Sequence, residues 1–184
     1  MTSLNWPATQ PTLTAGDLTL RPWRASDAEA VYVACQDSEI ARWTTIPVPY
    51  EREHAVGFVT ARSATAWANK TAAGFAALDA DGDLVGSFGL VRINQGQSVA
   101  EVGYWVAPGA RRRGVARRAA AAVTEWALRE IGFARVELLA ATGNAGSRRV
   151  AESVGFTQEG VLRSFAAGRG ERDDLVMYSK LPTD

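Results

Sequence analysis

The sequence of 184 residues has very little cysteine and histidine, and this limits the kinds of site that it can build. Its one cysteine, Cys35, excludes an intrachain disulfide and any cysteine-based metal cluster. Its one histidine, His54, makes a zinc site improbable. A Ser-His-Asp triad would need that same imidazole, and no GxSxG motif accompanies it. We therefore expect no metal and no redox cofactor.

Long apolar runs and an excess of one charge are also missing. No segment approaches the ~20 apolar residues of a membrane helix. The opening MTSLNWPATQ lacks the basic and apolar regions of a signal peptide. The formal net charge of +0 does not favour a dedicated nucleic-acid binder. The expectation is a cytoplasmic protein that binds neither membranes nor nucleic acid.

What the sequence does contain indicates one domain. A length of 184 residues and 47% hydrophobic residues are enough for one sizeable core. Residues 1–16 are polar and contain prolines, so we expect a loosely held N-terminal arm followed by a single domain over 17–184. Nearly all basic residues are arginine, whose planar guanidinium suits phosphate contacts better than lysine does.

Periodicity and turn signals predict an alternation of strands and helices. Alternating or continuous apolar patterns predict strands at 17–24, at two places within 74–93, at 99–108 and 135–141, and in two final segments around a turn at Gly168–Gly170. Helices are predicted from a capping box at Ser26–Glu29 to about residue 37, over 51–69, from about 115 to Gly132 and over 145–154. This order indicates an α+β fold, layered α/β/α, with a mixed central sheet of about seven strands, about four helices and a strand–helix–strand crossover.

The segment EVGYWVAPGARRRGVARRA places a short arginine-rich loop between a strand and a helix. The first turn of a helix has backbone amides without partners, and they attract anions. Small residues let a phosphate approach the backbone closely. We therefore predict a diphosphate site made by Arg111, Arg112, Arg113, Gly114, Val115 and Ala116. The alternative is an ordinary solvated helix start.

Motifs spread over the chain strengthen the first interpretation. From Asp17 to Leu181 the sequence resembles the GCN5-related N-acetyltransferase family, and within it the RimJ/RimL-like branch that acetylates N-termini of ribosomal proteins. The resemblance is carried, in order, by DLTLRPWRASDAEAV, AEVGYWVAP, the arginine-rich loop, GNAGSRRVAESVGFTQEGVLR and GERDDLVMYSKL. It implies the GNAT acyl-CoA N-acyltransferase fold, with acetyl-CoA as cosubstrate and its pyrophosphate on the arginine-rich loop.

The resemblance also implies roles for individual residues. Two central strands would splay apart around the pantetheine arm, which backbone groups of Trp105, Val106 and Ala107 would bind. A bulge on the first of these strands would aim the amide of Val106 at the thioester oxygen. Asn144 would bond the pantetheine, although an asparagine there is also typical of a helix cap. Many members protonate the thiolate with a tyrosine at the position of Ala151. In this sequence Ser147 is the candidate for the acid or hydrogen-bond donor to the thiolate.

Glu101 is the candidate general base, because it begins the central strand and shares a face with Gly103 and Trp105. The alternative is a strand-edge carboxylate in water or in a salt bridge. Glu159 is a second candidate. Trp43 and Trp105 could form an apolar slot for the acceptor, or each could simply pack in the core.

The resulting prediction is an acetyl-CoA-dependent N-acetyltransferase acting on a primary amine, either a protein or peptide N-terminus or a small molecule. A non-catalytic CoA-binding sensor is the alternative, since Ala151 replaces the common tyrosine. Nucleic-acid binding through Arg111–Arg118 is a third interpretation that the neutral balance disfavours. A homodimer is the assembly that the family suggests.

Overall fold

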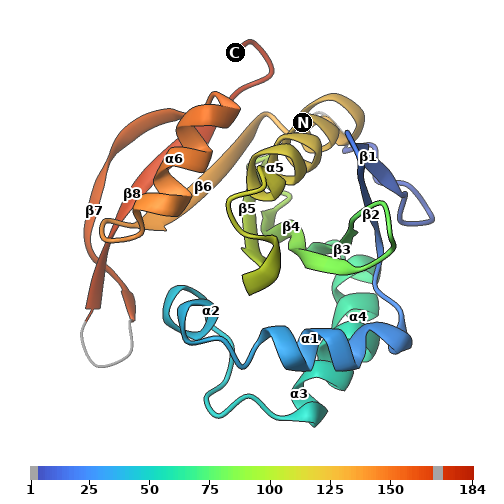
Figure 1. Cartoon of the computed structure of the whole chain (residues 1–184). Helices are drawn as coiled ribbons and strands as arrows, with labels where there is room; N and C mark the ends of the chain where they lie inside the picture. Colours follow the sequence, from blue (N-terminus) through green and yellow to red (C-terminus); the bar gives the residue numbers. More distant parts are fainter. Residues whose placement is uncertain (1–3, 168–171) are drawn as a thin grey trace.

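The computed structural model describes residues 4–167 and 172–184, and its centre is one mixed sheet (Figure 1). The described strands are β1 (Leu13–Ala15), β2 (Leu18–Pro22), β3 (Ala73–Leu78), β4 (Leu84–Asn94), β5 (Val99–Val106), β6 (Arg135–Ala141), β7 (Thr157–Ala167) and β8 (Arg172–Lys180). Their order across the sheet is β1-β2-β3-β4-β5-β6-β8-β7. Only the β5–β6 pair is parallel among these strands. The turn predicted at Gly168–Gly170 lies outside the described residues.

Helices cover both faces of the sheet. The described helices are α1 (Ala28–Ala34), α2 (Ser38–Trp43), α3 (Arg52–Gly57), α4 (Ser63–Ala68), α5 (Val115–Glu125) and α6 (Ala145–Val154). Figure 1 shows α5 and α6 next to each other over the sheet, with α1–α4 gathered in another part of the molecule. A π-helical turn, Phe58–Arg62, joins α3 to α4, so the helix predicted over 51–69 is continuous.

Two apolar clusters occupy the two sides of the sheet and confirm the α/β/α layering. The larger cluster lies under α5 and α6 and includes Phe75, Phe88 and Leu138. The second lies under α1–α3 and includes Trp23, Val31 and Trp105. β6 shows the alternation that produces the layers: Val136, Leu138 and Ala140 are buried, while the residues between them are half-exposed.

The N-terminal segment corrects the expectation of a loosely held arm. Residues 13–15 form strand β1 against β2, which brings the described sheet to eight strands. The Asn5 amide donates to the Ile131 carbonyl at 2.8 Å. The ring of Trp6 lies 4.5 Å from that of Trp67 and 6.3 Å from that of Trp126. A few apolar anchors in a polar segment are enough to dock it, because aromatic rings bury a large area.

The first helix begins differently from the prediction. The hydrogen bond at its start involves Arg24 and Asp27, not Ser26 and Glu29: the backbone amide of Arg24 donates to Asp27 Oδ2 at 2.8 Å. Arg21 also holds both oxygens of Asp27, at 2.8 and 2.7 Å. This buried pair fixes Asp27 in place, since a buried carboxylate needs such partners.

Helix α2 has no counterpart in the sequence prediction. It is only six residues long and begins where the side chain of Asp37 accepts a hydrogen bond from the Ile40 amide at 2.9 Å.

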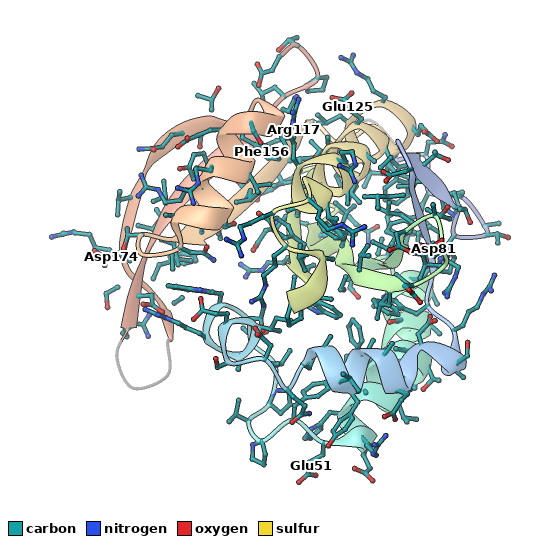
Figure 2. All side chains as sticks on the ribbon, in the orientation of Figure 1. Glu51, Asp81, Arg117, Glu125, Phe156 and Asp174 are labelled. Atoms are coloured by element: carbon teal, nitrogen blue, oxygen red, sulfur yellow. The ribbon has the colours of Figure 1, made fainter. Side chains whose placement is uncertain are left out.

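Asp81 and Asp174 are labelled at opposite sides of the molecule in Figure 2 and mark the β3–β4 turn and the β7–β8 hairpin.

Candidate functional site

The parallel strands β5 and β6 are paired over only three residues each. The partners are Val99 with Arg135, Ala100 with Val136, and Glu101 with Glu137. β6 continues to Ala141 with β8 on its other side. From Val102 onward, therefore, the β5 edge that faces β6 has no strand partner within the described residues. This is the splayed pair that the family resemblance implied.

The backbone groups that line this gap follow from the β4–β5 ladder. The amide of Ala107 donates to the Val85 carbonyl at 2.9 Å. Backbone groups alternate between the two edges of a strand, so those of Trp105 face β4 as well. Those of Tyr104 and Val106 face the gap. The expectation that Trp105 and Ala107 present backbone groups to a ligand is therefore wrong, whereas Val106 is correctly oriented. Sequence reasoning missed Tyr104.

The bulge lies on the strand next to the one expected. The β4–β5 register shifts between Leu90 and Arg92, so that Val91 is the extra residue and β5 itself is regular. A Cβ atom at Gly103 would come within 2.6 Å of Val91 Cγ1. The extra residue of β4 is accommodated because Gly103 has no side chain in that space.

The arginine-rich loop ends in backbone conformations that expose amides. Arg112 has a φ of 60° and Gly114 a φ of 72°, both left-handed, and α5 begins at Val115. The first-turn amides of α5 have no acceptor inside the helix and point out of its N-terminus. Left-handed residues beside a helix start build a concave set of amides that fits an anion. The loop is therefore suited to a diphosphate.

The loop arginines differ from one another in their partners. Arg111 Nη2 lies 2.5 Å from Asp37 Oδ1, which connects the loop to α2. Arg113 lies 3.9 Å from Asp79. Arg112 has no ion-pair partner among the residues that the structure describes. Of the three arginines predicted to face phosphate, Arg111 therefore serves first as a tie to α2.

Asn144 and Ser147 meet at the start of α6. The Asn144 Oδ1 atom accepts a hydrogen bond from the Ser147 amide at 3.0 Å, so Asn144 is the N-cap of the helix. The Ser147 hydroxyl lies 3.0 Å from the hydroxyl of Tyr104. Burial raises the pKa of Tyr104 to about 12, so its hydroxyl stays protonated near neutral pH. The bond joins β5 to the helix that follows β6, and thus spans the splayed pair.

Glu101 lies on the opposite face from Tyr104 and is largely withdrawn from water. Its side chain is 14% exposed, and Arg92 Nη2 lies 3.4 Å from its Oε2 atom. Burial raises the pKa of this carboxyl, the positive charge of Arg92 opposes the increase, and the neighbouring charge of Glu137 adds to it. A carboxyl in such a place is suited to take a proton.

Glu159, the second candidate base, is held in an ion pair and a hydrogen bond. Arg135 donates to both of its carboxylate oxygens at 2.6 and 2.5 Å, and the Ser179 hydroxyl donates at 2.6 Å. These bonds lower the pKa of Glu159 to about 2. A carboxylate that holds its charge so firmly is a weak base near neutral pH, so Glu159 acts as a structural ion-pair partner.

The two tryptophans predicted to form an acceptor slot lie in different environments. Trp105 is 9% exposed and packs in the second apolar cluster, which favours the core-packing alternative for it. Trp43 is half-exposed, and its indole nitrogen donates to Glu39 at 3.0 Å. Its ring edge would lie 3.4 Å from a Cβ atom at Gly143, in the loop after β6. Trp43 thus lies beside the splayed strands.

Among the described residues, no group of three or more His, Cys, Asp or Glu side chains could hold a metal ion. No described helix is both long enough and apolar enough to cross a membrane.

Comparisons with known proteins agree with this geometry. A family profile described as "Acetyltransferase (GNAT) domain" matches residues 17–157. YdaF of Bacillus subtilis (strain 168), which is named provisionally as a ribosomal N-acetyltransferase, is 38% identical over 101 residues, or 55% of each chain. The chain thus aligns with about half the length of that relative. The N-acetyltransferase YoaA of the same organism, named as uncharacterised, is 27% identical over 170 residues, covering 92% of this chain and 96% of YoaA.

A solved structure extends the likeness to nearly the whole chain. Mycobacterium smegmatis RimJ in complex with CoA-disulfide matches with a TM-score of 0.84 and 24% identity, covering 99% of this chain and 91% of that one. At that identity the match supports the fold.

Proposed function

Because the chain belongs to the GNAT acetyltransferase family, we propose that it transfers the acetyl group of acetyl-CoA to a primary amine, preferentially the N-terminal amine of a protein. The observation that carries this proposal is the separation of β5 from β6 after Glu101, next to the amide-rich start of α5. A gap between strands followed by an anion site suits an extended ligand that ends in a diphosphate.

Different residues would bind the pantetheine arm and the diphosphate of acetyl-CoA. Backbone groups of Tyr104 and Val106 face the gap and can pair with the amides of a pantetheine arm as an added strand would. Amides of Gly114, Val115 and Ala116 hold the diphosphate, and Arg112 adds positive charge. The Asn144 side chain uses its oxygen to cap α6, which leaves its amide protons for the pantetheine.

The transfer itself needs a neutral amine. Glu101 removes one proton from the acceptor ammonium, and the amine nitrogen then attacks the thioester carbon. The C–N bond forms, the C–S bond breaks, and the nitrogen's second proton passes through solvent water to the Ser147–Tyr104 hydroxyl pair, replacing the proton that this pair gives to the thiolate. The Val106 amide stabilises the negative charge on the carbonyl oxygen. The hydrogen-bonded hydroxyls of Ser147 and Tyr104 supply a proton to the leaving thiolate.

The choice of acceptor rests on the relatives and on amine chemistry. YdaF is named for ribosomal N-acetylation, and RimJ of M. smegmatis is a structural match over nearly all of this chain. An α-amine titrates near ~8, whereas a lysine amine titrates near ~10. A single carboxylate base therefore suits an N-terminus better than a lysine. Such an acceptor would be met in the cytoplasm. A homodimer remains our expectation for the assembly.

A sensor domain that binds CoA without turnover is the second candidate. It is favoured by Ala151, which replaces the tyrosine common in the family. Ala151 is 0% exposed, and its methyl group carries no proton to donate. Any thiolate acid must then come from another residue, and the Tyr104–Ser147 pair is available for that role.

The test is thiol release from acetyl-CoA against a panel of amines, with mass spectrometry of the products. The panel contains peptides with Ser, Ala, Thr and Met N-termini, polyamines, aminoglycosides and free amino acids. We expect turnover with at least one peptide. Tight binding of CoA with no turnover on any amine would favour the sensor over the enzyme.

A paired variant tests the cosubstrate site separately. Gly114→Glu should abolish acetyl-CoA binding in calorimetry, because its carboxylate would repel the diphosphate and its Cβ would come 2.9 Å from Arg118 Nη1. Gly57→Glu adds the same charge where a Cβ meets nothing within 4 Å, and should bind normally. Unchanged affinity in a folded Gly114→Glu protein would refute the site.

A further inference from the structure

Two carboxylates lie at the inner end of the gap, and only one of them has been given a role. Glu101 and Glu137 are register partners on β5 and β6, and theirs is the last pair before the strands separate. Neighbouring strands lie ~4.8 Å apart, and paired residues project from the same face of the sheet. The two side chains therefore emerge side by side on the face away from α5 and α6.

Their environments differ in a way that separates their roles. Arg135 Nε lies 2.7 Å from Glu137 Oε1, and Arg135 is in turn fixed by its paired bonds to Glu159. Among the described residues, the one cation paired with Glu101 is Arg92, at 3.4 Å, and the Arg92 side chain is 69% exposed and so screened by water. When two acids share a site, the one with the firmer cationic partner keeps its charge and the other takes the proton.

We propose that Glu137 is a positioning residue for acetyl transfer: ion-paired with Arg135, it lies beside Glu101 and makes Glu101 the member of the pair that takes the proton from the acceptor ammonium. The inference rests on the proposed function and deepens it. The proton moves from the ammonium nitrogen to a Glu101 oxygen. The same negative charge draws a cationic acceptor toward the inner end of the gap.

The charges that face Glu101 come from two strands. Arg92 reaches it from β4 and Glu137 from β6, while Arg135 and Glu159 act on it through Glu137. Consistent with this arrangement, burial is the main factor that raises the pKa of Glu101, Glu137 adds to the increase, and Arg92 opposes it. Removing the charge of Glu137 should therefore lower the pKa of Glu101, and removing the charge of Arg92 should raise it.

The test compares three variants by the pH dependence of kcat/KM for a peptide acceptor. Glu137→Gln should shift the acid limb to lower pH and leave a plateau about threefold lower, because Glu101 becomes a weaker base. Arg92→Gln should shift the limb to higher pH. Glu53→Gln, an exposed carboxylate on α3, should leave the profile in place. The KM for acetyl-CoA should stay unchanged in all three. An acid limb that stays in place in folded Glu137→Gln would overturn the proposal.

A readout without turnover separates this inference from the proposed function. Carbon-13 NMR titration of the glutamate carboxyls, with Glu101 assigned from Glu101→Gln, reports its protonation directly. A lower titration midpoint of Glu101 in Glu137→Gln supports the paired carboxyls even in a protein that acetylates no amine on the panel. An unshifted midpoint refutes the role of Glu137 even if acetyl transfer is robust.

Discussion

At the scale of single residues, two acidic side chains on the same side of the sheet differ in how freely they exchange protons. Glu101 is withdrawn from water beside another carboxylate, and Glu159 is bound by a guanidinium and a hydroxyl. Burial penalises the charge of the first, whereas hydrogen bonds favour the charge of the second. The first is therefore suited to proton transfer and the second to stability.

The first prediction concerns Glu101. Replacing it with glutamine removes the proton acceptor but keeps the size of the side chain. We expect kcat near neutral pH to fall by about a hundredfold, in keeping with the loss of a general base. Calorimetry should give an unchanged affinity for acetyl-CoA, because Glu101 lies on the opposite face from the Tyr104–Ser147 pair. Normal rates across the pH range would remove Glu101 as the base.

The second prediction concerns Glu159 and acid stability. Its pKa is lowered from the usual 4.5 to about 2 by Arg135 and Ser179. Because the folded value is the lower one, its stabilising contribution is complete above about pH 4.5 and is lost as the pH falls toward 2. In Glu159→Gln, urea unfolding midpoints measured from pH 5 to 2 should therefore fall less steeply than in the wild type. A slope equal to that of the wild type would contradict this assignment.

Residue types in order along the chain predicted part of the site. The family resemblance singled out Asn144 and Ser147, and the structure places both at one helix start. Glu101 was proposed from its place on the central strand together with the same resemblance. The orientation of backbone groups depends on the register with β4, which no local pattern reports, so Trp105 and Ala107 were assigned wrongly. Tyr104 was missed because its partner Ser147 is 43 residues away in sequence.

At the scale of elements, the short helix α2 connects both ends of the site. Its N-cap, Asp37, also binds Arg111 of the diphosphate loop, and its last residue, Trp43, lies against the loop before Asn144. A helix of six residues has little stability of its own, so its position depends on these end contacts.

The third prediction follows from that dependence. Asp37→Ala removes the cap and the ion pair together, and should reduce the free energy of unfolding by about 1 kcal/mol. Because Trp43 is then held less firmly, the KM for the peptide acceptor should rise. Chemical denaturation and steady-state kinetics measure the two effects. Asp81→Ala, in the exposed β3–β4 turn, is the matched control, and an acceptor KM no different from that control would refute a role for α2.

Elements with strong periodicity were predicted well from sequence, and those held by distant contacts were not. The apolar repeat and closing Gly132 gave α5, and alternation gave most strands. β1 and α2 were missed because they are only three and six residues long, which is too short for a recognisable hydrophobic periodicity. Their formation depends on β2 and on Arg111, which are brought to them by the tertiary fold.

At the scale of the whole molecule, the N-terminal segment fastens helices from both layers together. Trp6 contacts Trp67 at the end of α4 and Trp126 in the π-helical turn Trp126–Ile131 that continues α5, and Asn5 donates to backbone carbonyls of that turn. All three tryptophans belong to the larger apolar cluster, so the segment extends that cluster and ties α4 to it.

The fourth prediction tests this fastening. Trp6→Ala should reduce the free energy of unfolding by about 2 to 3 kcal/mol, since it empties a partly buried aromatic site. Guanidinium unfolding followed by circular dichroism gives the value. Trp43→Ala removes a tryptophan that is half-exposed and packs against only one loop, and should cost far less. Equal losses in the two variants would show that the N-terminal segment contributes no special stability.

The three-residue ladder between β5 and β6 has a mechanical consequence. The two halves of the sheet are paired with each other over this short ladder, and further contact between them comes from α5 packing on α6 and from the Tyr104–Ser147 hydrogen bond. A bound acyl-CoA would act as the missing strand and brace the short ladder. A ligand at a hundred times its Kd adds about 2.7 kcal/mol to the folded state. The concentration of acetyl-CoA would then affect the rigidity of the molecule as well as the rate of acetyl transfer. The protein without bound acetyl-CoA would be the form most easily cleaved by proteases.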